Sequence, residues 1–318
     1  MQKITELLRK KFTYSVELVP PRNGTDLKIV LDALETLRKI KVDFISVTKG
    51  AGGSLRGGTL PICCLAHERF GITSVAHYTC READSFRVEN ELVDQYYFGI
   101  KNVLALRGDP PDLTEQREKS TDKTLHGNYK YAYELVRDIK KLNRGKYIAR
   151  KKYDNTTEDY RNGIKTDFCI GVAAHPEEKD KDGSYEKGLE YLKKKVDEGA
   201  DFAITQMLFD AEKYRIFAAK ARDAGITIPI IPGIWPLDTR WKLEQAEKKF
   251  KVSIPSKIKK ELNGIEDPEE FKKKGIELTV ELCKKLKKYG APGIHLFLFL
   301  DANIAEVIFD EIRKGEKA

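Results

Sequence analysis

Charged and polar side chains follow directly after apolar, strand-like segments at several places in this sequence. In the stretch VLALRGDPPDL, Arg107, Gly108 and Asp109 come immediately after four apolar residues and before two prolines. Proline lacks a backbone N–H and ends strand pairing, which places the Arg107–Asp109 pair at the C-terminal end of a strand. Taken alone, such a pair is more typical of a turn with a structural ion pair. The interpretation changes because the same arrangement recurs along the chain.

The other strand-like segments also end in acids, imidazoles, hydroxyls or amides. These residues are Glu17, Thr48, His77 with Thr79, His175 with Glu177, Gln206, and Asp301 with Asn303. Side chains of these types can transfer protons and hold a polar ligand. If the strands run parallel, their C-terminal ends meet at one rim, and we interpret the set as a shared pocket.

Glu17 is the most informative of these residues because it lies inside the apolar segment YSVELV. Burial disfavours the carboxylate form and raises the pKa of the group, which suits a general acid near neutral pH. The alternative is a structural acid paired with Arg22 or Arg107. The sequence therefore predicts a proton donor at position 17 and leaves the paired structural acid open.

The sequence offers little support for a metal centre. His77 and His175 could be core histidines, metal ligands or ligand contacts, but no clustered carboxylate and cysteine partners accompany them. Of the five cysteines, Cys63 and Cys64 are adjacent and the others are scattered without a CxxC spacing. We therefore expect neither zinc nor disulfides. The glycine run at 50–58 could admit a ligand to the backbone or form tight turns.

Eight short apolar segments that alternate with helical patterns would position these side chains. The predicted strands are 14–19, 44–48, 74–79, 103–106, 168–174, 202–208, 228–231 and 294–300. The predicted helices are 27–40, 60–66, 84–98, 129–142, 185–198, 211–224, 254–263, 269–289 and one from about 303. This alternation predicts an α/β protein of the (β/α)₈ TIM barrel type, with extra helices before the last strand.

A doubly wound parallel sheet is the second architecture that this alternation allows. Its usual glycine fingerprint is missing, because GAGGSLRGG carries Leu55 where the third glycine belongs and lacks the Gly-Lys-Ser/Thr of a P-loop. Residues 143–167 are polar, contain several aromatics and show no period. We expect this segment to join a helix to the next strand on the face away from the strand C-termini, where it could serve as a docking surface.

Composition limits the classes of protein that remain. The 318 residues are enough for one large barrel or two ordinary domains, and we expect a single catalytic barrel over 1–318. No run of about 18 apolar residues exists, which predicts a soluble cytoplasmic protein without a membrane segment. The net charge is +8, but the lysines alternate with glutamates, as in EQAEKKFK. With no recognisable nucleic-acid motif, we do not expect nucleic acid as a partner.

Nine segments, in order and over nearly the whole chain, resemble the methylenetetrahydrofolate reductase family. They are YSVELVPPR, SVTKGAGGS, SVAHYTC, LALRGDPP, YAYELV, GVAAHPE, KKKVDEGADFAITQMLFD, IPIIPGI and HLFLFLDANIAE. The resemblance implies a barrel that binds FAD and reduces 5,10-methylenetetrahydrofolate to 5-methyltetrahydrofolate, for methionine supply or an acetyl-CoA pathway. It also implies a ping-pong reaction in which NAD(P)H is the co-substrate and leaves before folate binds.

The resemblance assigns roles to individual residues. Glu17 matches the acid that protonates the folate bridge nitrogen, Asp109 the aspartate beside the flavin ring and the pterin, and Gln206 the glutamine that contacts folate and nicotinamide in turn. The positions matching FAD contacts are Thr48, His77, Arg107, Gly108, Asp109, Tyr131, Ala132, Ala173, His175 and Lys195. Asp301 and Asn303 join Glu17 and Gln206 on the folate side.

Four positions depart from the family pattern. Lys49, His175 and Lys179 stand where an aromatic, a tyrosine and a histidine are usual, and Ile304 stands where the family has a folate-contacting arginine. The chain ends soon after the barrel, so we expect no S-adenosylmethionine-binding regulatory domain. The alternative within the fold is a flavin-poor reductase, or one fed by an electron-donating partner subunit, in a homo- or hetero-oligomer. The remote alternative is a noncatalytic basic binding protein.

Overall fold

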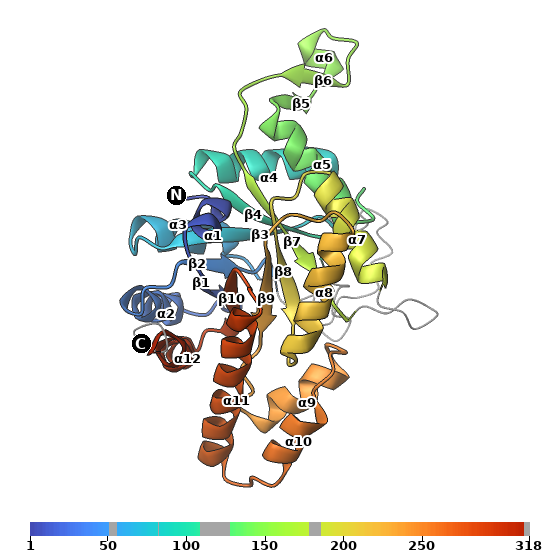
Figure 1. The fold of residues 1–318 in the computed structure, drawn as a ribbon. Coiled ribbons are helices and arrows are strands. Elements are labelled where there is room, and N and C mark those ends of the chain that lie inside the picture. Colours follow the sequence, from blue (N-terminus) through green and yellow to red (C-terminus); the bar gives the residue numbers. More distant parts are fainter. Residues whose placement is uncertain (51–55, 82, 109–127, 178–185, 315–318) are drawn as a thin grey trace, which may run out of the picture.

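A closed barrel of eight parallel strands forms the centre of the computed structural model, which describes residues 1–50, 56–81, 83–108, 128–177 and 186–314 (Figure 1). The barrel strands are β1 (Thr13–Leu18), β2 (Phe44–Val47), β3 (Thr73–Thr79), β4 (Asn102–Leu106), β7 (Cys169–Ala174), β8 (Phe202–Met207), β9 (Ile230–Ile234) and β10 (Gly293–Phe299). They pair in the order β1-β10-β9-β8-β7-β4-β3-β2. The (β/α)₈ prediction is confirmed, and the doubly wound sheet is wrong because that sheet would be open.

Helices surround this barrel on its outside. They are α2 (Lys28–Lys39), α3 (Thr59–Glu68), α4 (Ser85–Tyr97), α5 (Ala132–Asn143), α7 (Glu186–Asp197), α8 (Ala211–Asp223) and α12 (Ala302–Lys314). In α2, Val30, Leu34 and Leu37 recur at helical spacing and are fully buried against the strands. The predicted helices thus form because each carries one apolar face that fits the barrel wall.

Three further helices lie between β9 and β10 and extend below the barrel in Figure 1. They are α9 (Arg240–Lys248), α10 (Ser256–Asn263) and α11 (Pro268–Lys288). A second apolar cluster, which includes Trp235, Leu262 and Phe271, fills the space between them. The prediction of extra helices before the last strand is therefore confirmed.

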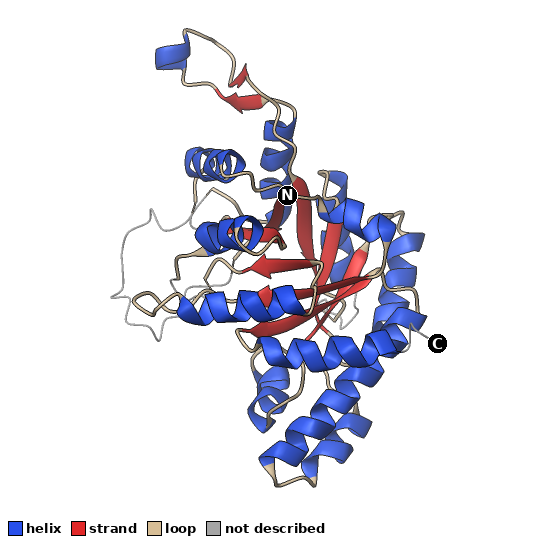
Figure 2. Ribbon diagram, turned by 90° about the vertical axis from the view of Figure 1, so that its left-hand side faces the viewer, coloured by secondary structure: helices blue, strands red, loops and turns tan. Residues whose placement is uncertain are grey.

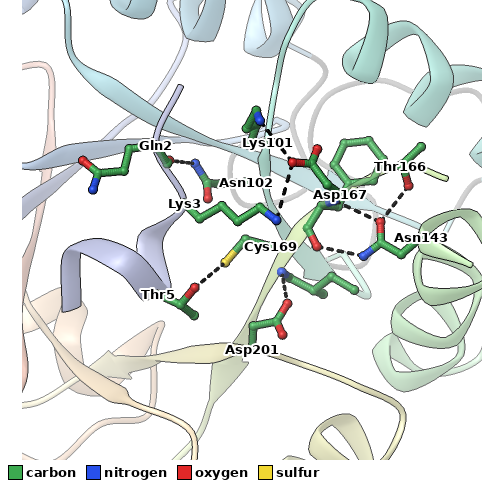
Figure 3. A network of polar contacts seen from close by, with 12 residues as sticks. Gln2, Lys3, Thr5, Lys101, Asn102, Asn143, Thr166, Asp167, Cys169 and Asp201 are labelled. Carbon is green, nitrogen blue, oxygen red and sulfur yellow. Dashed lines mark hydrogen bonds and ion pairs between the residues drawn. The ribbon is translucent and has the colours of Figure 1, made fainter. Parts of the chain in front are cut away.

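A short helix that the sequence pattern did not predict, α1 (Ile4–Lys10), closes the end of the barrel where the strands begin. Ile4 packs into the apolar cluster that fills this end of the barrel. Asn102, fully buried at the start of β4, accepts a hydrogen bond at Oδ1 from the Ile4 N–H (3.0 Å). Its Nδ2 donates to the Gln2 carbonyl at 2.9 Å (Figure 3). It also donates to the Ser74 carbonyl at 3.2 Å. The Asn102 side chain thus links the N-terminal segment to β3 and β4 by hydrogen bonds.

Replacing this side chain by one of similar size without polar atoms should destabilise the barrel. Asn102→Leu leaves the buried Ile4 N–H, the buried Ser74 carbonyl and the partly buried Gln2 carbonyl without these hydrogen bonds. We expect a loss of about 3 kcal/mol in the free energy of unfolding. Urea denaturation measures it. Lys101→Ala, which removes only a half-exposed ion pair to Asp167, is the control and should cost less than about 1 kcal/mol. Equal losses in the two variants would contradict the role of Asn102.

Residues 145–163 form an excursion from the barrel, which we call the arm. It contains β5 (Lys146–Ile148), α6 (Lys151–Asp154) and β6 (Tyr160–Asn162), with β5 and β6 paired antiparallel. The Gly163 N–H donates to the Gly145 carbonyl at 2.8 Å, so the arm closes on itself. It follows α5 and precedes β7, and it projects beyond the barrel where the strands begin (Figures 1 and 2). The predicted excursion is therefore present, with short strands that its irregular pattern did not indicate.

The seventh barrel strand differs from its predicted bounds. The sequence pattern ended it before Pro232, whereas β9 continues through Pro232 to Ile234. The β8–β9 register shifts between Ile204 and Met207, opposite this proline, so no regular ladder bond needs its missing N–H. A Cβ on the next residue, Gly233, would lie 2.3 Å from the Thr205 carbonyl oxygen, so only glycine fits there.

Candidate active site

Polar side chains from strands far apart in the chain meet at the end of the barrel where the strands stop. Because all eight strands are parallel, the ends that carry Glu17, His77 and Gln206 lie on one rim. We call this rim the mouth. Glu17 of β1 and His77 of β3 approach directly, with 3.6 Å between Oε2 and Nε2. The predicted convergence at one mouth therefore holds for these described residues.

The Glu17 carboxyl is kept out of water by the strands around it. Its side chain is 19% exposed, and desolvation raises its pKa from 4.5 to about 8, so the group is mostly protonated at neutral pH. Of the described residues, only His77 lies within ion-pair distance of it. Neither Arg22 nor Arg107 pairs with it, so the structural ion pair considered for this acid is wrong.

His77 is a neutral imidazole beside this acid. Burial lowers its pKa to about 3, and its Nε2 has no hydrogen-bond partner among the described residues. The Thr48 hydroxyl, just beyond β2, is also buried without a hydrogen-bond partner in this part of the chain. Two neighbouring strands thus present unpartnered polar atoms at the mouth, which a polar ligand could satisfy.

A second buried histidine, His295 of β10, lies deeper in the barrel and was missed by the sequence analysis. Its ring is fully buried and stacks on Phe44 at 5.9 Å between centroids. Nδ1 lies 2.8 Å from the Ser15 hydroxyl and Nε2 3.1 Å from the Ser46 hydroxyl. The signal was present, since His295 is a polar residue inside an apolar strand, as Glu17 is.

Two cations and a histidine form a separate part of the mouth. Lys195 of α7 is 8% exposed, and its Nζ donates to the Ala173 carbonyl at 2.7 Å. The pKa of His175 falls to about 4, mainly through desolvation and further through the charges of Lys195 and Arg107. The charges of both cations therefore act on the His175 ring, and two positive charges suit an anionic ligand group.

The remaining predicted site residues are placed as follows. Gly108 has a φ of +95° and follows β4, while Tyr131 and Ala132 begin α5, with the Tyr131 ring stacked on Tyr133 and Tyr191. Gln206 is the last residue but one of β8 and accepts at Oε1 from the N–H of Met207 (2.9 Å). Asp301 and Asn303 are exposed beside the end of β10. Asp109 and Lys179 lie outside the described residues.

Two of the positions that depart from the family pattern have structural explanations. Ile304 is 2% exposed and belongs to the main core, so its side chain packs α12 onto the barrel and does not face the mouth. Lys49 pairs with Glu91 at 2.7 Å and lies 4.1 Å from the centroid of the Tyr78 ring. Glu177 binds Lys213 of α8 (2.7 Å), so this strand-end acid joins the segment after β7 to that helix.

Other features of the described residues lie away from the mouth. A cavity of about 360 Å³ lies between α4, α5 and the arm, and none of the site residues lines it. Within the described ranges, no three His, Cys, Asp or Glu side chains are grouped so that they could hold a metal ion. All five cysteines are free. No described helix is both long and apolar enough to span a membrane.

Comparison with known proteins gives a consistent result. A family model described as methylenetetrahydrofolate reductase matches residues 1–312. Methylenetetrahydrofolate reductase (NADH) 1 of Arabidopsis thaliana is 32% identical over 294 residues, 89% of this chain and 45% of that protein. The 5,10-methylenetetrahydrofolate reductase of Escherichia coli is 29% identical over 295 residues, 92% of this chain and 88% of that protein. This chain therefore spans about half the length of the plant relative.

A solved structure of similar fold is an uncharacterized protein from Clostridium thermocellum that binds two copies of 5-methyl-5,6,7,8-tetrahydrofolic acid. It superposes with a TM-score of 0.59 and 13% identity, and the match covers 98% of this chain and 99% of that one. At this identity the likeness supports the barrel fold alone.

Proposed function

Because the chain belongs to the methylenetetrahydrofolate reductase family, we propose that it reduces 5,10-methylenetetrahydrofolate to 5-methyltetrahydrofolate, with FAD as cofactor and NADH as donor. The observation that carries this proposal is the desolvated Glu17 carboxyl, whose raised pKa keeps a proton available at the mouth at neutral pH. NADH is preferred because the Arabidopsis relative is named for it.

The acid–base part of the reaction belongs to Glu17. Its carboxyl donates a proton to the bridge nitrogen of the substrate, the C–N bond of the five-membered ring breaks, and an iminium carbon remains on the pterin side. FAD, once reduced by NADH at this site, would supply the hydride that this carbon accepts. The exclusion of water at the mouth keeps the proton on Glu17 until the substrate nitrogen arrives. In this proposal Gln206 and Asp109 contact the folate, and Asp301 and Asn303 at the rim contact it as well.

The residues at the mouth fit a cofactor with a polar ring and a diphosphate. Thr48 Oγ1 and His77 Nε2 are buried polar atoms without hydrogen-bond partners among the described residues, which a flavin ring edge would satisfy. Lys195 and Arg107 both lower the pKa of His175 by their charge, and these two positive charges would suit the diphosphate. A Cβ on Gly108 would lie 3.2 Å from Thr79 Cβ, so the chain packs tightly beside this site.

Removing one cation should weaken FAD binding. We expect Lys195→Met to raise the dissociation constant of FAD ten- to a hundredfold, because a charge-assisted hydrogen bond to phosphate contributes about 1.5–3 kcal/mol. Quenching of flavin fluorescence on titration of the apoprotein measures the constant. Lys194→Met is the matched control, since Lys194 is the preceding residue and pairs with Glu190 at the surface. Equal dissociation constants for the two variants would contradict the assignment of Lys195.

Anaerobic stopped-flow spectroscopy of the two half-reactions tests the proposed function. The purified protein should be yellow, NADH should bleach its flavin absorption, and methylenetetrahydrofolate should restore it. Comparing the rates of flavin reduction by NADH and by NADPH identifies the donor. A colourless protein that transfers hydride from nicotinamide directly, or one that requires a second protein as donor, would contradict the role of FAD or of NADH respectively.

A further inference from the structure

A chain of hydrogen bonds runs through the barrel interior directly beneath the mouth. It begins at the backbone carbonyl of Ile294, continues through the Ser15 hydroxyl (3.0 Å) and the His295 ring (2.8 Å), and ends at the Ser46 hydroxyl (3.1 Å). All three side chains are fully buried. A buried polar group without a hydrogen-bond partner is costly in free energy, so each member of this hydrogen-bond chain keeps its partners.

The carbonyl at one end fixes the direction of every bond in this chain. A carbonyl can only accept, and a serine hydroxyl has one hydrogen, so Ser15 donates to Ile294 and accepts from His295 Nδ1–H. The His295 ring is neutral at physiological pH, because burial, and to a smaller extent the interaction with His77, lower its pKa to about 3. It therefore has no hydrogen on Nε2, and Ser46 must donate to that atom.

The end of the chain lies beside the catalytic acid. Ser46 and Glu17 are register partners on the adjacent parallel strands β2 and β1, so their side chains project to the same side of the sheet, into the barrel. Because the hydrogen of Ser46 is directed to His295, the hydroxyl presents only lone pairs on its other side. A carboxylate at the neighbouring register position would receive no hydrogen from Ser46, whereas a protonated carboxyl would find an acceptor there.

We propose that Ser15 is a positioning residue that sets the direction of this buried chain, so that Ser46 offers no hydrogen to Glu17 and the acid stays protonated. Around Glu17, the titratable groups from the neighbouring described strands are His77 of β3 and, deeper in the barrel, His295 of β10, while β2 offers only the Ser46 hydroxyl. Both imidazoles are neutral at pH 7, so no described cation opposes the effect.

Three variants separate this role from a packing role. In Ser15→Ala the fixed end is lost, His295 can carry its hydrogen on Nε2, and Ser46 is released to donate to the Glu17 carboxylate. We expect the pH midpoint of the folate half-reaction to fall by about one unit. In Ser46→Ala, and in the double variant, no hydroxyl is left to donate, and the midpoint should stay at the wild-type value. A packing defect would instead lower the rate by a similar factor in all three variants and would leave the pH midpoint unchanged.

A second measurement needs no turnover and observes the wild-type protein, with one variant used only to assign its signals. The chain has five histidines, so ¹⁵N-histidine labelling gives few signals, and the His295 signals are those missing from the His295→Gln spectrum. Long-range ¹H–¹⁵N correlation should show His295 of the cofactor-free protein with its hydrogen on Nδ1. A hydrogen on Nε2, or equal midpoints in Ser15→Ala and Ser46→Ala, would overturn the proposal.

This inference rests on the proposed function only for its kinetic readout. If the wild-type protein gave no folate turnover, the proposed function would fail, and the His295 tautomer would still test the direction of the chain. If turnover occurred but the midpoints did not separate, the inference alone would fail.

Discussion

Glu17→Gln is expected to slow the folate half-reaction at least a hundredfold while flavin reduction by NADH stays within a few-fold of wild type. Glutamine has nearly the same shape and keeps the site packed, but its amide cannot supply a proton, and general acid catalysis contributes about 10²–10⁴ in rate. Anaerobic stopped-flow traces of the two half-reactions measure the effect separately.

The control for this experiment is Glu35→Gln, which makes the same chemical change in an exposed helical ion pair with Arg38. It should leave both half-reactions unchanged. An equal decrease of both half-reactions in Glu17→Gln would show that residue 17 supports the site as a whole and is not the acid. The wild-type folate half-reaction should also slow as the pH rises through about 8, because the carboxyl then loses its proton.

The same substitution should stabilise the protein at alkaline pH. The pKa of Glu17 is higher in the folded state, about 8, than the 4.5 of the unfolded chain, so folding favours the protonated form. The contribution of this group to stability is therefore complete below pH 4.5 and is lost progressively as the pH rises to about 8. Glutamine carries no charge at any pH and escapes this loss.

We expect Glu17→Gln to exceed wild type by roughly 2–4 kcal/mol in the free energy of unfolding at pH 8.5, at about 1.4 kcal/mol per pKa unit, discounted for the exposed part of the side chain. The difference should nearly vanish at pH 4.5. Urea denaturation at the two pH values, on protein without added cofactor, measures it. Equal differences at both pH values would mean that the carboxyl is not desolvated. A gain in stability together with a loss of activity is typical of functional residues.

Much of the fold could be predicted because the barrel is built from repeated local patterns. All eight barrel strands are short apolar segments, and helices such as α2 carry one apolar face, so both periods are visible in the sequence. The exceptions had weak local signals. The helix α1 is only seven residues long and gains its stability from closing the barrel, and β9 continues through Pro232 only because its partner strand shifts register there.

Part of the candidate site could likewise be predicted from the sequence, and part could not. The sequence by itself determined that acids and imidazoles stand at strand ends, and it singled out Glu17, because a charged residue within an apolar strand is a local pattern. Only the tertiary structure decided that His77, sixty positions away, lies 3.6 Å from that acid, and that Ile304 packs inward. It also revealed the Ser15–His295–Ser46 chain. These outcomes depend on desolvation and on the register between strands, and both arise only when distant segments close into the barrel.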